Sequence, residues 1–294
     1  MTNTTRKTLP ASFAVFALLF TAIGWAGITP AQPGTCYATT GSGGSAPASL
    51  LTVDISTGEA EFVGASGERQ LPGLAIDSAG QMFTTDDSNL YAIDAATGAT
   101  TLIGSFGGSV FVEGLAFDSS DTLWGVDALL ALVTINTTTA QITVVGNHGV
   151  FNIIGLAFDP SGRLYGSVGG NAASPGDIYQ FNTSDGSVSL VGNAGLGRPV
   201  SDLHFFDGQM YGVAGGGGSQ GIPFDLITVN LGSGAATIVG PTGFSSVSSL
   251  DGDCVFSHAS IPTLNIYGIL ALMLILMLGA TVTLRAHRRR AGNQ

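Results

Sequence analysis

The middle of the chain is a succession of short apolar runs separated by polar turn residues. Between residues 36 and 260, runs rich in Val, Ile, Leu, Phe and Tyr alternate with Gly, Asp, Asn and Ser. No stretch in this region keeps a helical period over three turns, whereas short apolar runs bounded by turn residues are typical of strands. The region is therefore predicted to be all-β.

The runs recur in a fixed series with a period of about 41 to 48 residues. One copy has its four runs at residues 90–94, 101–104, 114–118 and 123–127. Similar copies cover residues 51–86, 133–166 and 178–212, and a fifth begins at residue 226. Four strands in a unit of this length are typical of one propeller blade. We predict a β-propeller of five four-stranded blades over residues 35–257.

Both ends of the chain are hydrophobic and predict export. Arg6 and Lys7 precede an apolar run over residues 9–28, followed by small residues and Pro, which is the order of a secretory signal peptide. We assign residues 1–31 to it, with cleavage after Ala26 or after Ala31. Retention as a signal anchor is the alternative, because the run approaches the length that spans a bilayer.

The C-terminal run predicts a transmembrane helix. Residues 266–284 are apolar and long enough to cross a bilayer, and a basic tail over residues 285–294 follows. Its arginines are Arg285, Arg288, Arg289 and Arg290. Positive charge favours the cytoplasmic side, so the propeller is expected outside the inner membrane.

A short motif precedes this helix, in a linker over residues 258–265. Ile261, Pro262, Thr263 and Leu264, followed by the helix and the arginine cluster, resemble the IPTL-CTERM sorting signal of Gram-negative bacteria. The resemblance implies recognition by an exosortase-type transpeptidase, which cuts near the motif and passes the ectodomain to the cell surface or the medium. Residues 265–268 lack the acidic residue usual in that family, and a plain membrane anchor is the alternative.

The ends of the repeat region suggest how the ring closes. Residues 35–40 resemble the last run of a copy, 81–86, and the fifth copy lacks that run. We expect the N-terminal strand to complete the last blade. Cys36 and Cys254 then lie on adjacent strands, and export to an oxidising compartment predicts a disulfide between them, with two free buried thiols as the alternative.

Charge excludes one class of partner. Three of the nine Lys and Arg residues lie within residues 35–260 together with all twenty Asp and Glu residues, so the formal net charge there is −17. Nucleic acid is not expected to bind, because phosphate backbones require Lys or Arg. Asp54, Asp94, Asp118 and Asp159 recur at turns, where a side-chain acceptor is needed.

Candidate chemistry rests on a second resemblance. Residues 155–166 resemble the repeats of NHL-like and lactonase-like bacterial propellers, and lactonase-like members hold a divalent cation on Glu, Asn and Asp side chains. The candidates here are Glu113, Asn152 and Asp202, which precede the same element in successive copies and suit Ca²⁺. No other cofactor is expected.

The remaining polar residues suggest no catalytic set. His148, His204 and His258 show no metal-ligand spacing and are interpreted as loop or packing residues, and no serine lies in a nucleophile elbow. The prediction is a monomeric, non-enzymatic propeller that binds a surface protein or glycan. A cation-dependent lactonase or hydrolase and a structural spacer without a ligand are the alternatives.

Overall fold

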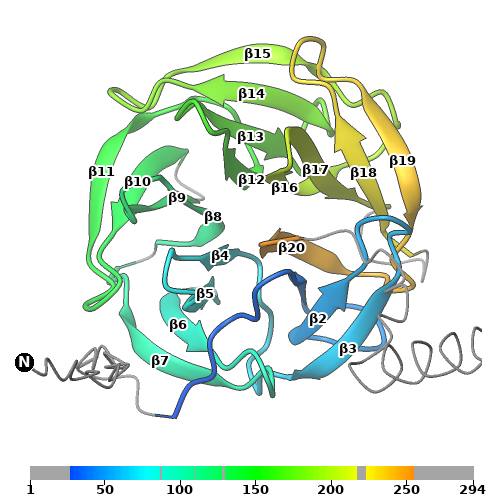
Figure 1. The fold of residues 1–294 in the computed structure, drawn as a ribbon. Helices are drawn as coiled ribbons and strands as arrows, with labels where there is room; N and C mark the ends of the chain where they lie inside the picture. Colours follow the sequence, from blue (N-terminus) through cyan, green and yellow to red (C-terminus); the bar gives the residue numbers. More distant parts are fainter. Residues whose placement is uncertain (1–26, 87, 109, 128–129, 217–222, 255–294) are drawn as a thin grey trace, which may run out of the picture.

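The computed structural model describes residues 27–86, 88–108, 110–127, 130–216 and 223–254. These residues form twenty strands in five antiparallel four-stranded sheets, which surround a central axis as a β-propeller (Figure 1). Residues 1–26 of the predicted signal peptide, the sorting motif, the transmembrane helix and the basic tail lie outside the described residues, as does His258. Within the described part, no helix is long and apolar enough to span a membrane.

Four blades are built from consecutive strands, each running from the axis outwards. Blade 1 contains β4 (Leu74–Ile76), β5 (Met82–Thr85), β6 (Asn89–Ile93) and β7 (Thr100–Ser105). Blade 2 contains β8 (Val112–Phe117), β9 (Leu123–Asp127), β10 (Ala131–Ile135) and β11 (Ile142–Asn147). Blade 3 contains β12 (Ile153–Phe158), β13 (Leu164–Val168), β14 (Asp177–Phe181) and β15 (Val188–Asn193). Blade 4 contains β16 (Val200–Phe206), β17 (Gln209–Ala214), β18 (Asp225–Val229) and β19 (Ala236–Pro241).

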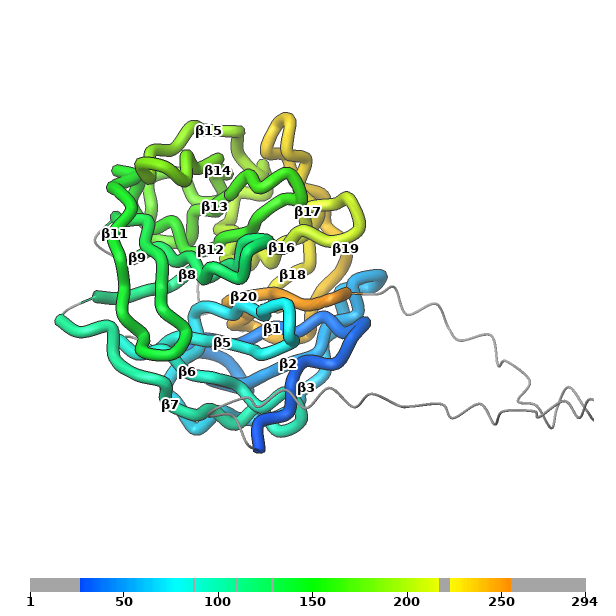
Figure 2. The backbone as a smooth tube through the Cα atoms, turned by 60° about the vertical axis from the view of Figure 1, so that its left-hand side comes forward, coloured from blue at the N-terminus to red at the C-terminus, as the bar shows by residue number. Residues whose placement is uncertain are grey.

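The fifth blade, the closing blade, combines both ends of the propeller. Its order is β20 (Val247–Gly252), β1 (Cys36–Thr40), β2 (Ser49–Val53) and β3 (Ala60–Ala65), so the last strand is innermost (Figure 2). β1 pairs with β20 as predicted, with Tyr37 opposite Asp251. The prediction was wrong about the rest of this sheet, because β18 and β19 belong to blade 4 and three N-terminal strands surround one C-terminal strand.

The sequence copies are out of phase with the blades. Each copy joins the two outer strands of one blade to the two inner strands of the next. A repeating pattern has no intrinsic starting point, and only the hydrogen-bonded pairing decides where a sheet begins.

The closure is covalent as well. Cys36 and Cys254 form a disulfide with their Cα atoms 4.4 Å apart, which confirms the predicted pairing. The bond joins residues separated by 218 positions, across the seam between the first and last strands.

The hydrophobic core is divided among the blade interfaces. One buried cluster combines Phe83 and Leu90 of blade 1 with Val112, Leu115 and Val133 of blade 2, and the other interfaces are filled in the same way. The Gly-Leu-Ala element predicted to be a strand buried between blades is the innermost strand, as in Leu115, which is 2% exposed.

Glycines allow close contact at the outer ends of these interfaces. A Cβ on Gly98, whose φ is +74°, would lie 2.5 Å from the carbonyl oxygen of Gly64 in the neighbouring blade. The same contact recurs at Gly146–Gly186, Gly192–Gly234 and Gly240–Gly58. Between blades 1 and 2 the turn position holds Ala140 at a φ of 59°, a left-handed conformation that disfavours any residue with a Cβ.

Candidate functional site

A hollow with both polar and apolar side chains in its wall lies where the five inner strands begin. Its volume is about 300 Å³, at the lower end of the range for ligand pockets. Each blade contributes the residue at one equivalent position to its wall, and these five residues are Pro72, Glu113, Ile154, Ser201 and Ser248. We call this hollow the mouth.

β-Bulges explain why these side chains face the mouth. The pairing register shifts at Glu113, Ile154, Ser201 and Ser248, each of which is the extra residue of its inner strand. A bulge leaves one residue out of the ladder and turns its side chain, and bulges are enriched near binding sites for that reason. In blade 1 the position is Pro72, which lacks a backbone N–H and precedes β4.

Two asparagines complete the wall on the side of blade 3. Asn152 and Asn171 adopt left-handed backbone conformations, with φ values of 67° and 61°. The Asn152 side-chain amide donates to the carbonyl oxygen of Gly170, and the Asn152 carbonyl accepts from Gly169 at 2.9 Å. Asn tolerates this conformation better than other residues with a Cβ, so both positions suit the residue that occupies them.

Only two of the three candidate cation ligands share the mouth. Glu113 and Asn152 line it, whereas Asp202 does not and lies one residue beyond the bulge of its strand. The structure makes Ile154 and Ser201 the equivalents of Glu113, in place of Asn152 and Asp202. Asn152 stands two positions before Ile154, and Asp202 itself occupies the position that Gly114 and Gly155 hold in the other copies.

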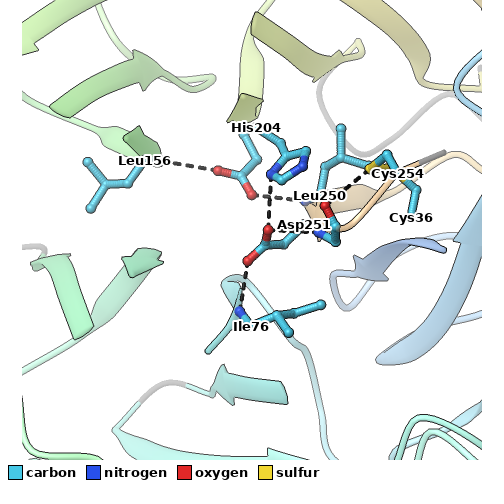
Figure 3. A network of polar contacts seen from close by, with 9 residues as sticks. Cys36, Ile76, Leu156, His204, Leu250, Asp251 and Cys254 are labelled. Carbon is cyan, nitrogen blue, oxygen red and sulfur yellow. Dashed lines mark hydrogen bonds and ion pairs between the residues drawn. A yellow bond between two sulfur atoms is a disulfide. The ribbon is translucent and has the colours of Figure 1, made fainter. Parts of the chain in front are cut away.

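Asp202 belongs to a second group of polar residues close to the axis, with His204 and Asp251, which we call the axial cluster. Figure 3 shows His204 beside Asp251. Asp202 is 2% exposed, and its two carboxylate oxygens accept from the backbone N–H groups of Leu156, at 3.1 Å, and Leu250, at 2.9 Å. One carboxyl group thus joins the inner strands of blades 3 and 4 to that of the closing blade.

Asp251 makes the corresponding connections on the other side of β20. Its Oδ1 lies 3.0 Å from Nδ1 of His204, and its Oδ2 accepts from the backbone N–H of Ile76 at 2.7 Å. The pair ties the closing blade to blades 4 and 1. His204, predicted to be a loop or packing residue, is instead part of inner strand β16.

Burial affects the ionisation of one member of this cluster, Asp202. It raises the pKa of Asp202 well above its usual range, against the opposing effect of the amides of Leu250, Leu203 and Leu156, and the nearby Asp251 carboxylate adds to the rise. Nε2 of His204 is buried without a hydrogen-bond partner among the described residues. A cavity of about 160 Å³ borders His204 and Asp251 inside the ring.

The sequence did contain a signal for the axial cluster. Blades 1 to 3 have Gly-Leu-Ala on the inner strand, whereas blade 4 has Asp202, Leu203 and His204 and the closing blade has Ser249, Leu250 and Asp251. Polar residues that interrupt an otherwise apolar repeat would have identified these positions.

The other histidine within the described residues packs as predicted. His148 is 7% exposed, its ring lies edge-on to Phe181 with centroids 5.5 Å apart, and burial lowers its pKa to about 4. Across the described part of the chain, no three His, Cys, Asp or Glu residues are grouped so that they could hold a metal ion.

Comparison with known proteins supports the fold alone. No family model and no curated protein matches the chain. A structural-genomics protein of unknown function from Bacteroides thetaiotaomicron superposes with a TM-score of 0.52 and 14% identity, over 77% of this chain and 65% of that one. A chain of the nidogen/laminin complex gives a TM-score of 0.49 and 18% identity, over 74% of this chain and 97% of that one. A symmetrical protein from work on de novo evolutionary emergence gives 0.49 and 17%, over 75% and 99%.

Proposed function

We propose that this protein is an exported, non-enzymatic binding module that holds its ligand in the mouth of the propeller. The observation that carries the proposal is the set of bulge residues, Glu113, Ile154, Ser201 and Ser248, which four inner strands contribute to the wall of one hollow. Bulges recur throughout this fold, since each outermost strand also has one, but there the extra residues are the aliphatic Val63, Ile103, Val145, Val191 and Val239. At the mouth three of the four extra residues are polar, which a shared ligand explains better than packing does.

The ends of the chain suggest where the module works. The apolar N-terminal run, the Ile-Pro-Thr-Leu motif at 261–264 and the C-terminal apolar segment with its arginines support export, inner-membrane anchoring and sorting by an exosortase-type transpeptidase to the cell surface. A mass spectrum of the protein from its host tests this. A C-terminus near residues 261–264 would support sorting, and an intact tail would reduce the proposal to anchoring.

The segment before β1 favours one of the two cleavage positions. Ala31 donates its backbone N–H to the carbonyl oxygen of Gly80 at 2.7 Å, and Thr29 donates to the Asp94 carboxylate at 2.7 Å. Cleavage after Ala26 retains both contacts, and cleavage after Ala31 removes them. We therefore propose that the mature chain begins at Gly27, which the same mass spectrum checks.

Ligand binding in the mouth can be measured on the full-length protein in detergent. With the isoleucine δ1 methyl groups labelled with ¹³C, the Ile154 signal is the one missing from an Ile154→Val variant, and it reports on the mouth. A library of neutral, cationic and anionic fragments is expected to shift this signal with at least one class. A library that leaves Ile154 unchanged while shifting signals elsewhere would refute binding in the mouth, and no shift at all would favour the spacer.

The lactonase alternative is separated by a parallel assay. The same protein with added Ca²⁺ is expected to leave simple lactones unhydrolysed beyond the buffer rate. Hydrolysis that is lost in a Glu113→Gln variant would replace the binding proposal with an enzymatic one.

A further inference from the structure

The side chains of the mouth differ from the rest of the propeller surface in chemistry. The polar residues of its wall are three amides, three hydroxyls and one carboxylate, and no cation lines it; they are Gln70, Asn152, Asn171, Ser201, Ser246, Ser248 and Glu113. An anionic ligand would be repelled by Glu113 and by the net charge of −17 over residues 35–260, and no cation in the wall would offset this. The lining instead suits a ligand with many hydroxyl groups, which can both donate to and accept from amides and hydroxyls.

Two exposed aromatic residues lie on the loops that supply this wall. Phe111 is 41% exposed and Phe151 is 60% exposed, and they stand two residues before Glu113 and one residue before Asn152. The other exposed large hydrophobic residues of the described chain occupy one equivalent position on the five outermost strands, namely Phe62, Leu102, Val144, Leu190 and Ile238. Phe111 and Phe151 are therefore the exceptions, and both lie on the loops of the mouth.

We propose that the mouth binds a neutral saccharide, an inference that rests on the proposed binding function. Phe111 and Phe151 would cover the apolar C–H face of a sugar ring, as exposed aromatic rings do for flat apolar groups. The amides of Asn152 and Asn171 and the Glu113 carboxylate would bind its hydroxyls, and a carboxylate acceptor makes the stronger, charge-assisted bonds. The small volume favours one sugar residue of a longer chain, with the remainder outside.

A cationic ligand is the nearest competitor. It would use the Glu113 carboxylate, the two aromatic rings and the oxygen atoms of the wall, and it would leave the N–H and O–H donors of the amides and hydroxyls without a role. The two classes also differ in salt dependence, because screening weakens the binding of a cation and leaves that of a neutral sugar nearly unchanged.

The test titrates the full-length protein with named compounds while following the Ile154 methyl signal. The neutral panel is maltotriose, mannobiose, lactose and diacetylchitobiose; spermidine and digalacturonate represent the charged classes. We expect at least one neutral saccharide to shift Ile154 with an affinity that changes less than twofold between low and high salt. Digalacturonate and spermidine are expected to leave the signal in place.

Matched variants assign the contact. Phe151→Ala is expected to weaken saccharide binding tenfold or more, and Phe62→Ala, which removes a similarly exposed ring from outer strand β3, is expected to leave it unchanged. Binding of spermidine that is lost in Glu113→Gln would overturn the saccharide and leave the binding function standing. Failure of all four saccharides, or equal loss in both phenylalanine variants, would overturn the saccharide proposal.

Discussion

The inner strands of blades 1 to 3 pack around the axis differently from those of blade 4 and the closing blade. In the first group the inner strands approach so closely that a Cβ on Gly73 or Gly114 would lie 2.4 or 2.6 Å from a carbonyl oxygen of the next inner strand. In blade 4 and the closing blade the equivalent positions carry Asp202 and Ser249, and His204 and Asp251 replace alanines. Polar side chains stand where the ring is closed, and direct backbone contact suffices elsewhere.

The difference reflects how β20 is held. The inner strands of blades 1 to 4 continue directly into the next strand of their own sheet, whereas β20 pairs with a strand from the other end of the chain. Besides that pairing, β20 is held by the bond from Leu250 to Asp202, the contacts of Asp251, the side-chain hydrogen bonds of Ser248 and Ser249, and the nearby disulfide. We therefore expect the axial cluster to hold β20 in place where the ring closes.

The largest effect is expected from the disulfide. Replacing Cys36 and Cys254 together with Ser should lower the free energy of unfolding by about 4–5 kcal/mol, because the cross-link closes most of the chain and restricts the unfolded state. Urea denaturation measures the loss, and reduced wild-type protein should show the same midpoint as the variant. An unchanged urea midpoint would mean that the axial cluster alone keeps the first and last strands together.

Removing the Asp202 carboxylate from the axial cluster should have the next largest effect on the free energy of unfolding. Asp202→Asn places an amide nitrogen, which has no acceptor, against the backbone N–H of Leu156 or Leu250, and should cost about 2–3 kcal/mol. Asp207→Asn is the matched control, an exposed position with a φ of 45° that Asn tolerates, and it should change stability by less than about 0.5 kcal/mol. Equal effects of the two variants would remove the distinction between the seam and the other blades.

The stability contributed by the axial cluster should depend on pH because the pKa of Asp202 is raised. A carboxyl group with a higher pKa in the folded state contributes stability at low pH, and that contribution is lost as the pH rises through the folded value. The stability advantage of wild type over Asp202→Asn should therefore be larger at pH 5 than at pH 8 in urea titrations. A difference that grows toward pH 8 would show that the amides, and not burial, control this carboxyl.

The smallest effect concerns a contact away from the seam. Ala140→Gly relieves a left-handed alanine at the interface of blades 1 and 2, and should raise stability by up to about 1 kcal/mol. The reverse change at the equivalent Gly98, Gly98→Ala, should lower stability by more than that, since its Cβ would meet Gly64. Thermal unfolding of both variants checks the opposite signs, and a shift in one direction for both would contradict the account.

Part of the candidate site was accessible from the sequence. Glu113 and Asn152 were placed near the axis because they precede the same repeated element, and the structure confirms that both line the mouth. Ile154 directly precedes Gly-Leu-Ala as Glu113 does and was overlooked in favour of a polar neighbour. Ser201 and Ser248 were missed because Asp202 and Ser249 replace the glycine that marks the element in the other copies. His204 and Asp251 were missed because they are far apart in sequence and contact only through the closed ring.

The sequence by itself determined the number of blades, the four strands of each and the pairing of the two cysteines. Apolar periodicity, turn residues and repetition are local properties, and they follow directly from the order of the residues. Only the tertiary structure decided where each blade begins within a sequence copy, which strands form the closing blade, where the bulges at the mouth lie, and which residues form the axial cluster. Those features depend on hydrogen bonds between strands distant in sequence, and a repeating pattern is compatible with more than one register until those bonds form.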